Sequence, residues 1–327
     1  MVRFLLRRLV GKALLLVVAA SCAHLLAATA LDPRGNYEGQ RPPPPAETVD
    51  ALLDEYNLNP DTPLAERYLV WASGVVTGDF GRSWDGSDVT AQLVRRVGVS
   101  LRLLALGAAL GALGGVLLGA LAASRHRGGL DRTSVAVSLL VISTPAVVVA
   151  VSLQSAALWV NQVTGSELLR ATGEFTPGLN GGPVAQVMDR ARHLLLPTLT
   201  VALPQIALFS RYQRNLMLDE AGSDYVRTAR AKGLTKRAAL FRHGLRTALG
   251  PAVTYFGYSS ALLFASAVFT EKVFGWHGVG EYLLDSVGRG DVHAVAAVCC
   301  FGALCVVTAG LLADIGRFLV DPRTRVL

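Results

Sequence analysis

Charged residues are scarce in this chain of 327 residues: they make up 17% of it, whereas hydrophobic residues make up 52%. A typical soluble domain carries about 25% charged residues, so this composition argues against an ordinary water-soluble body. It also excludes an intrinsically disordered chain, which lacks apolar residues. The net charge of +7 is compatible with a nucleic-acid partner, but the apolar content favours a membrane protein instead.

Lysine is rarer still, with four positions only: Lys12, Lys232, Lys236 and Lys272. None of them lies in a Gly-x-x-x-x-Gly-Lys-Ser/Thr motif, whose backbone N–H groups cradle phosphate. We therefore predict a chain that binds no nucleotide and no other cofactor and is not an enzyme. If it takes part in active transport, the energy must come from another subunit.

Cysteine is also infrequent. No CxxC motif with a further Cys or His partner occurs. The chain has four cysteines, all inside apolar runs: Cys22, Cys299, Cys300 and Cys305. This pattern excludes a disulfide framework, and we predict no metal site and four small buried apolar side chains.

Long apolar runs dominate what is present. A helix that spans a bilayer needs roughly 20 mostly apolar residues. Pro197 and Pro204 interrupt one of the runs, and Arg211 and Arg214 enter its far end. The predicted spanning segments are Leu9–Leu31, Val99–Ala123, Thr133–Val160, Leu194–Leu218, Pro251–Val273 and Val292–Val320.

The distribution of charge predicts the topology. The first segment follows Arg3, Arg7 and Arg8, which favours a cytoplasmic N-terminus by the positive-inside rule. Six crossings then place both termini in the cytoplasm. With this topology the inner side holds 19 of the 31 basic residues against 6 of the 24 acidic ones, so the acidic loops face outward. An alternative for the first segment is a secretory signal peptide cleaved near Ala28–Ala30. Its removal would leave five crossings and spoil this charge pattern.

Two outer loops are predicted. The first, 32–98, is acidic, contains the stiff run Pro42–Pro45, and includes a short amphipathic helix over Ala46–Tyr56. The second, 161–193, is rich in Gly and Pro and has little periodicity. The membrane segments themselves are almost free of ionisable groups at depth, apart from His24 and Arg102. A proton-coupled or sodium-coupled carrier therefore has few residues to work with.

Small residues recur every four positions in the second segment. A stripe of this kind lets another helix approach closely, either within this chain or from a second membrane subunit. The residues of the stripe are Gly107, Gly111, Gly115 and Gly119.

The longest inner loop, 219–250, predicts a compact knob. A helix is expected over Ser223–Lys232, ended by Gly233, with a second helix over Thr235–Leu249 before Pro251. In the first helix Tyr225, Ala229 and Lys232 are predicted to share one face, while Arg227 and Arg230 lie on another. Such a loop suits either an anionic lipid surface or a cleft in a cytoplasmic partner.

The stretch from Asp224 to Leu234 (DYVRTARAKGL), followed by Arg242–Arg246 (RHGLR), resembles the cytoplasmic EAA loop of binding-protein-dependent ABC importer permeases. The form is that of the dipeptide, oligopeptide and nickel branch, and the similarity extends over nearly the whole chain. Further matches, in the order of the family, are Gly78–Ser83 (GDFGRS), Ser143–Pro145, Arg192–Pro197, Glu271–Phe274 with Gly278–Gly280, and Asp321–Arg323 (DPR).

Three departures from the family pattern stand out. Arg227, Thr228 and Ala229 occupy the positions of the literal Glu-Ala-Ala. His277 stands where many members have proline, and Leu31-Asp32-Pro33 replaces the usual exit of the first segment. The last departure weakens any inference about the geometry of the first outer loop.

The resemblance implies an all-α type I importer permease with six transmembrane helices. It implies a second homologous permease subunit, two ABC ATPase subunits that bind ATP and Mg, and an extracytoplasmic substrate-binding protein or lipoprotein, with no nucleic acid. The bilayer surrounds the complex in the cytoplasmic membrane. The residues it assigns to ATPase coupling are Asp224, Tyr225, Arg227, Thr228, Ala229, Arg230, Lys232, Gly233, Leu234, His243 and Arg246.

The predicted organisation begins with an N-terminal cytoplasmic stretch and the first transmembrane helix over 1–31. An outer loop over 32–98, a permease core over 99–320 and a cytoplasmic tail over 321–327 follow. Di- or oligopeptides are the expected substrate. A nickel or other small-solute importer of the same branch is an alternative, as are a stand-alone carrier and a membrane scaffold. The scaffold reading does not explain the compact inner knob.

Overall fold

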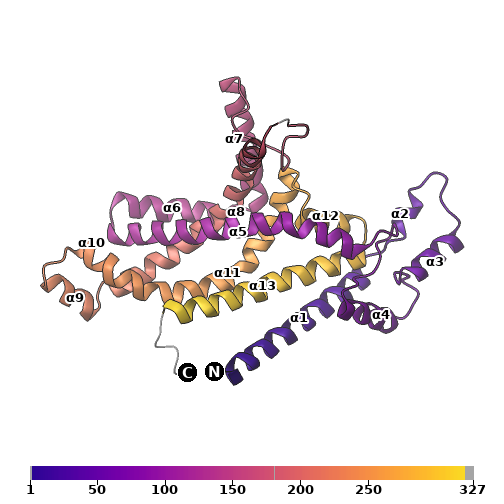
Figure 1. Cartoon of the computed structure of the whole chain (residues 1–327), viewed down its shortest axis with the longest axis horizontal. Coiled ribbons are helices and arrows are strands. Elements are labelled where there is room, and N and C mark those ends of the chain that lie inside the picture. The colour runs from indigo at the N-terminus through magenta and orange to yellow at the C-terminus, as the bar shows by residue number, and fades with distance from the viewer. Residues whose placement is uncertain (1, 180, 321–327) are drawn as a thin grey trace. The chain divides into compact units, whose positions relative to one another are not determined.

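The computed structural model describes residues 2–179 and 181–320, and the tail with its Asp321–Arg323 motif lies outside them. Most of the described residues are helical, and among them the only β-type pairing is an isolated bridge between Arg82 and Asp88 (Figure 1). The helices are α1 (Val2–Ala30), α2 (Gly35–Glu38), α3 (Ala46–Glu55), α4 (Leu64–Thr77), α5 (Val89–Ser124), α6 (Gly129–Ser143), α7 (Ala146–Thr164), α8 (Pro183–Glu220), α9 (Asp224–Ala231), α10 (Lys236–Ala239), the π-helix η1 (Leu240–Gly244), α11 (Leu245–Phe274), α12 (Val279–Gly288) and α13 (Val292–Val320).

The chain forms two compact units. Unit 1 comprises Met1–Leu101 and His277–Val307, and unit 2 comprises Arg102–Trp276 and Thr308–Leu327. Helices α5 and α13 contribute residues to both. The proposed coupling loop and most of the predicted permease core belong to unit 2, whereas the first predicted outer loop belongs to unit 1.

Five helical stretches among the described residues are long and apolar enough to cross a membrane: Val10–Ala30, Val89–Ser124, Ala146–Thr164, Pro183–Glu220 and Val292–Arg317. They confirm the predicted first, second, fourth and sixth segments as membrane-spanning candidates. The predicted fifth segment lies within α11, and its crossing stays a prediction, as do the total of six and the cytoplasmic position of both termini.

The prediction that the third segment is a single helix from Thr133 to Val160 was wrong. It is divided at Thr144 into α6 and α7. Thr144 has an extended backbone (φ −94°, ψ 125°) because the ring of Pro145 excludes the α-conformation from the residue before it. Helix α6, with 15 residues, is shorter than the roughly 20 residues needed for a crossing.

Proline affects two other boundaries. Helix α8 begins at Pro183, whose missing N–H is harmless in a first turn, so residues 183–193 are helical and the predicted second outer loop is shorter than expected. The second helix of the inner loop was predicted to end before Pro251, but α11 continues through it to Phe274. Thr247, whose carbonyl loses its helical donor there, is exposed.

The glycine stripe of α5 lies against α8. An ideal Cβ placed on Gly115 would be 2.3 Å from the Cβ of Phe209, and one on Gly111 would be 2.6 Å from the Cβ of Gln205. At Gly119 the nearest atom is the backbone oxygen of Ser210, at 2.5 Å. Real Cβ atoms do not approach other atoms this closely. The two helices can therefore make this contact only because the stripe has no side chains.

Unit 1 is built around the end of α1. Arg34, just beyond α1, donates hydrogen bonds through one guanidinium nitrogen to Asp50, Asn59 and Asp61 at 2.8, 3.0 and 2.6 Å. Beside this hub a small core forms from α1, α3 and α13, with Leu53 and Leu58 fully buried. The observed α3 confirms the short helix predicted over Ala46–Tyr56.

We expect Gly115→Ala to destabilise unit 2, because its Cβ would overlap the α5–α8 contact and overpacking of this kind costs about 1–3 kcal/mol. The measurement is thermal unfolding of the purified protein in detergent. Gly98→Ala on the same helix is the matched control, since nothing lies within 4 Å of its Cβ position. Equal melting temperatures for the two variants would contradict the close contact.

Candidate functional site

The inner loop carries its own small core. Val226 and Ala229 of α9 and Ala239 of α10 are buried together, and Leu234 from the connecting turn packs against them. Burial of these side chains against one another holds α9 beside α10, and the pair lies together with η1 in Figure 1. The predicted compact knob is therefore present, although its core is only a few apolar side chains.

Gly233 makes the turn between the two helices. The Leu234 N–H donates to the carbonyl of Ala229 at 3.2 Å, and the Gly233 N–H donates to that of Arg230 at 3.0 Å. This is the hydrogen-bond pattern of a Schellman motif, which places the residue after the cap in the left-handed region. Gly233 has φ +94°, as the motif requires. The predicted end of the helix at Gly233 is confirmed, with Lys232 as the C-cap.

The observed α9 begins at Asp224, one residue after the predicted start at Ser223. Ser223 occupies the N-cap position, but its hydroxyl donates instead to the carbonyl of Glu220 at 2.7 Å. The Tyr225 hydroxyl donates to the Glu220 carboxylate as well. These two bonds anchor α9 to the last turn of α8. Thr235 caps α10 by accepting the Ala238 N–H at 3.2 Å.

The faces of α9 also differ from the prediction. Ala229 was placed on one face with Tyr225 and Lys232, yet Ala229 is buried with Val226 while Tyr225 and Lys232 are exposed. Ala229 therefore fills the knob and is not on its outer surface. Many of the exposed residues of the loop are basic, and we call this set the cationic face: Arg227, Arg230, Lys232, Lys236, Arg237, Arg242, His243 and Arg246.

The knob rests on a second apolar cluster. Met217 of α8 and Leu240 of η1 are fully buried against Ala120 and Ala123 of α5 and Ala248 of α11. Gly244 belongs to the same joint, because a Cβ there would lie 3.0 Å from a methyl group of Leu240. The π-turn of η1 thus fixes the loop directly to the ends of α5 and α8.

A buried ion pair ties α6 to the same end of α8. The Arg214 guanidinium donates to both carboxylate oxygens of Asp131, at 2.5 and 2.9 Å, and the backbone N–H of Arg127 donates at 2.8 Å. Asp131 is 3% exposed. These donors, Arg214 first, lower the pKa of Asp131 to about 2. The sequence showed Arg214 only at the far end of an apolar run. Its pairing with Asp131 was missed because the two residues lie in distant segments.

We expect Asp131→Asn to lower the melting temperature strongly. A half-buried Arg214 would lose its counter-charge, and breaking a buried pair by removing one partner costs about 3 kcal/mol or more. Asp224→Asn is the control, since Asp224 and Arg227 form an exposed pair at 3.7 Å and such pairs contribute little.

The same ion pair sets an acid limit on stability. The carboxylate has a depressed folded-state pKa, so its contribution is complete above the ordinary value of 3.8 and is lost as the pH falls toward 2. Asp131→Asn should lack this component of the acid unfolding curve. Identical curves and melting temperatures for the wild type, Asp131→Asn and Asp224→Asn would contradict the assignment.

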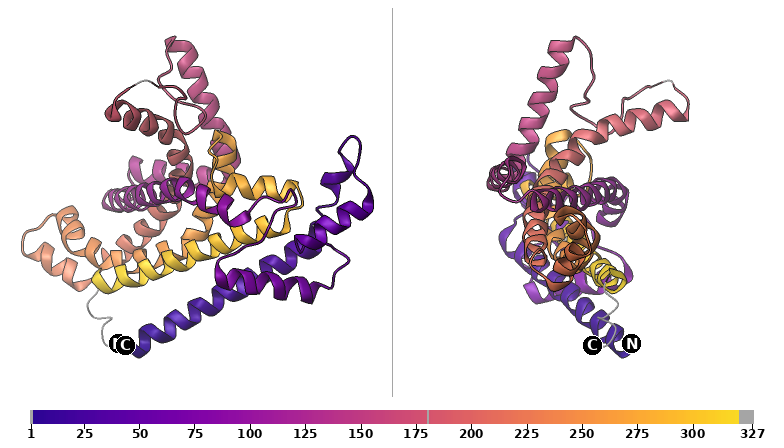
Figure 2. Two further views of the ribbon diagram at one scale, coloured as in Figure 1. Left: turned by 45° about the vertical axis from the view of Figure 1, so that its right-hand side comes forward. Right: turned by 90° about the vertical axis from the view of Figure 1, so that its left-hand side faces the viewer.

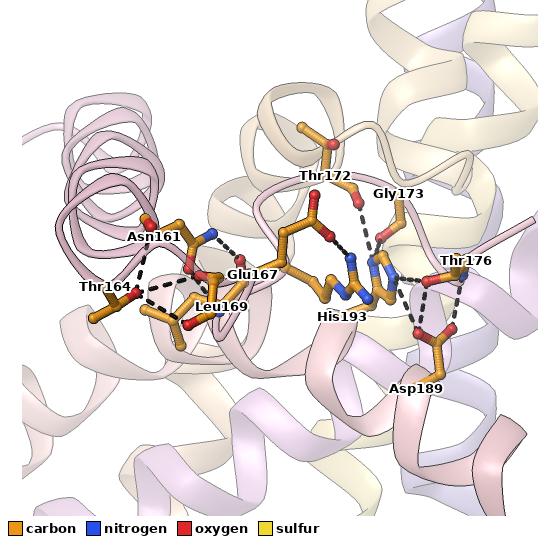
Figure 3. A network of polar contacts seen from close by, with 11 residues as sticks. Asn161, Thr164, Glu167, Leu169, Thr172, Gly173, Thr176, Asp189 and His193 are labelled. Atoms are coloured by element: carbon orange, nitrogen blue, oxygen red, sulfur yellow. Dashed lines mark hydrogen bonds and ion pairs between the residues drawn. The ribbon is translucent and has the colours of Figure 1, made fainter.

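A separate network orders the connection between α7 and α8 (Figure 3). The His193 Nδ1–H donates to the carbonyls of Thr172 and Gly173, both at 3.0 Å. Thr176 donates through its N–H and its hydroxyl to the two oxygens of Asp189, each at 2.7 Å. His193 was noted in the sequence only as part of a motif. The sequence did not show that His193 holds an irregular loop against α8. That role depends on two backbone carbonyls that only the fold brings close to the ring.

Unit 2 also contains a cavity of about 410 Å³ lined by residues of α6, α7, α8 and α11. Pro145 lies at the α6–α7 break and Pro204 inside α8, and both line the cavity. Most of the lining is apolar, but the Ser266 hydroxyl is buried without a hydrogen-bond partner and Gln205 donates to Ser259 at 3.1 Å. Among the described residues no group of three or more His, Cys, Asp or Glu side chains is arranged to hold a metal.

Residues 115–326 match the family model described as "Binding-protein-dependent transport system inner membrane component". The oligopeptide transport system permease protein OppB of Mycobacterium tuberculosis is 46% identical, over 100% of both chains. AppB of Bacillus subtilis, an oligopeptide transport system permease protein, is 32% identical over 84% of both.

The solved structures give a more distant match of the same kind. A chain of the MetNI methionine ABC transporter, in an inward-facing conformation, shares 17% identity and superposes with a TM-score of 0.54, covering 70% of this chain and 96% of that one. This supports the type I importer permease fold, and the apolar helices agree with a multi-pass location. The chain belongs to the family of binding-protein-dependent transport system inner membrane components, which are transport subunits of the inner membrane.

Proposed function

We propose that this chain is a permease subunit that conducts di- or oligopeptides through the inner membrane in an ATP-driven importer. The observation that carries the proposal is the identity of 46% over the full length to an oligopeptide permease. A relative named as a di/tripeptide permease, from Pseudomonas aeruginosa, supports the same substrate class at 31% identity over 90% of both chains.

The partners follow from the same proposal. A second homologous permease completes the pathway, and an extracytoplasmic binding protein or lipoprotein delivers the peptide. Two ATPase subunits bind ATP and Mg and supply the energy. The inner loop is the docking element for an ATPase, because it offers a cationic face on a knob that is fixed to α8. Arginine and lysine on such a surface pair with carboxylates of a partner and steer its approach.

The coupling residues have different tasks in this proposal. Arg227, Arg230 and Lys232 contact the ATPase, and His243 and Arg246 extend the same surface onto η1 and α11. Gly233 and Leu234 hold the turn, and Ala229 fills the core. Asp224, Tyr225 and Thr228 order the first helix; the Thr228 hydroxyl donates to the Asp224 carbonyl at 2.9 Å.

The cavity at Pro145 and Pro204 provides this chain's contribution to the peptide pathway. It lies between the α6–α7 break and α8, and its unpartnered Ser266 hydroxyl offers a hydrogen bond to a passing peptide group. An apolar lining with few polar groups suits substrates that carry varied side chains on a common backbone.

The substrate is tested by transport into proteoliposomes that hold the complete importer with its binding protein. We expect ATP-dependent uptake of labelled di- and oligopeptides, and no ATP-dependent uptake of radiolabelled nickel. Uptake of nickel without peptide uptake would overturn the peptide assignment but leave the permease family intact. A vesicle preparation that lacks the ATPase subunits is the control for passive leakage.

We expect Gly233→Val to uncouple ATP hydrolysis from transport. A β-branched residue at φ +94° is strained by about 1–3 kcal/mol, so the turn must rearrange and α9 shifts on its core. Peptide uptake and substrate-stimulated ATPase activity should fall several-fold while the complex still assembles.

Gly222→Val is the matched control for this variant. It lies in the same loop, outside the left-handed region, and its Cβ position has only the Asp219 carbonyl oxygen within reach, at 4.0 Å. Wild-type uptake and wild-type ATPase stimulation in Gly233→Val would argue strongly against a coupling role for the knob.

A further inference from the structure

Helix α4 of unit 1 has two apolar faces, although it belongs to a segment predicted as an outer loop. One face is packed: Trp71 is 5% exposed, and Tyr68 and Val75 lie in the same cluster. The opposite face is open, with Leu69, Val70 and Val76 at 67%, 54% and 87% exposure. A helix in water normally exposes polar residues on its outer face, so this composition needs an explanation.

The packed face of α4 lies along a membrane-spanning helix. The Tyr68 and Ser21 hydroxyls are hydrogen-bonded at 2.7 Å, and the His24 ring stacks on Trp71 with centroids 4.2 Å apart. Figure 1 and the left view of Figure 2 show α4 beside the second half of α1. Ser21 is nine residues before Ala30, where α1 ends, which is about 13 Å along a helix axis. The packed face therefore reaches well below the end of the span.

Helix α13 gives the same depth independently. Trp71 is buried with Ala296 and Cys300, and Cys300 is eight residues into α13, about 12 Å from its start. The chain then returns along α13. Phe80 packs in the same cluster, a Cβ on Gly81 would meet the His293 ring at 2.8 Å, and Ser83 donates to Asp291.

The segment from Leu64 to Ser83 is therefore re-entrant. Leu64 packs on the core at the end of α1, and Tyr68 contacts α1 deeper, at Ser21. After the turn at Gly78, with φ +87°, the chain returns to the start of α13. The open face of α4 continues the exposed apolar surface of α1, where Leu14, Val17 and Val18 are more than half exposed. Because α1 is a membrane-spanning candidate, that surface faces lipid.

We propose that α4 lies in the extracytoplasmic leaflet of the bilayer, with Leu69, Val70 and Val76 in contact with acyl chains. Interfacial helices of this kind bury their apolar face about 5–10 Å into the boundary between headgroups and chains. Of the exposed polar residues, Glu66 and Thr77 lie at the two ends of α4. Ser73 lies between them, and its hydroxyl donates to the carbonyl of Val70 at 2.8 Å, so it brings no unsatisfied donor to the lipid. The predicted outer loop over 32–98 is then only partly in water. This inference goes beyond the proposed function and does not depend on the transported substrate.

The test is site-directed spin labelling of the full importer in liposomes. The native cysteines are first replaced (C22A, C299A, C300A and C305A), and single cysteines are introduced as Leu69→Cys and Val76→Cys. Leu14→Cys on α1 is the lipid-facing reference, and Ala51→Cys, exposed on α3, is the water-facing reference. The measured quantity is the ratio of accessibility to oxygen, which partitions into lipid, and to a water-soluble nickel chelate.

We expect the ratio at Leu69 and Val76 to match that at Leu14 and to exceed that at Ala51. A ratio like that of Ala51 would overturn the proposal. If the accessibility to each reagent then fell when the binding protein was added, the surface would be a protein-docking surface instead. Low accessibility to both reagents without the binding protein would also overturn it and identify a contact with the second permease.

Discussion

The close approach of α5 and α8 is the contact on which the rest of unit 2 depends. In a membrane the hydrophobic effect does not drive helices together, so association relies on close packing and on hydrogen bonds between helices. At Gly119 the approach is close enough that the nearest obstacle to a Cβ is the backbone oxygen of Ser210. A larger residue there would separate the two helices, and every element fixed to α8 would lose its support.

Those elements are fixed to α8 at successive heights. Gln205 bonds to Ser259 of α11, Arg214 pairs with Asp131 of α6, and Met217 packs on Leu240 of η1. The cavity at Pro204 and the joint at Met217 are thus 13 residues apart on one helix, or about 20 Å. In the proposed importer, movement of the knob reaches the cavity as displacement of a packed helix. A chain of independent side-chain switches is not needed for this transmission.

The elements that were predictable from the sequence are those encoded by short-range patterns. The first, second, fourth and sixth apolar spans, the turn at Gly233 and the short helix predicted over Ala46–Tyr56 depend on composition and on local backbone preferences, and the structure contains each of these. The errors arose where local rules compete. Apolar composition favoured one helix across Pro145, but the restriction on Thr144 divided it. At Pro251 the same residue type stands inside α11, and Thr247, four residues before it, is an exposed residue. Partners brought together by the fold, such as Asp131 with Arg214 or His193 with two carbonyls, leave no local pattern in the sequence.

The stretch Gly78–Ser83 shows how a family resemblance differs from a physical role. The sequence identified it as a match to importer permeases without indicating what it does. In unit 1 it is the returning arm of a re-entrant segment: Gly81 leaves room for His293, and Ser83 donates to Asp291, whose carboxyl pKa is raised by burial. A side chain larger than hydrogen at position 81 would push the arm away from α13. The glycine and the serine therefore hold the arm against α13, and through it they fix where α4 meets the bilayer.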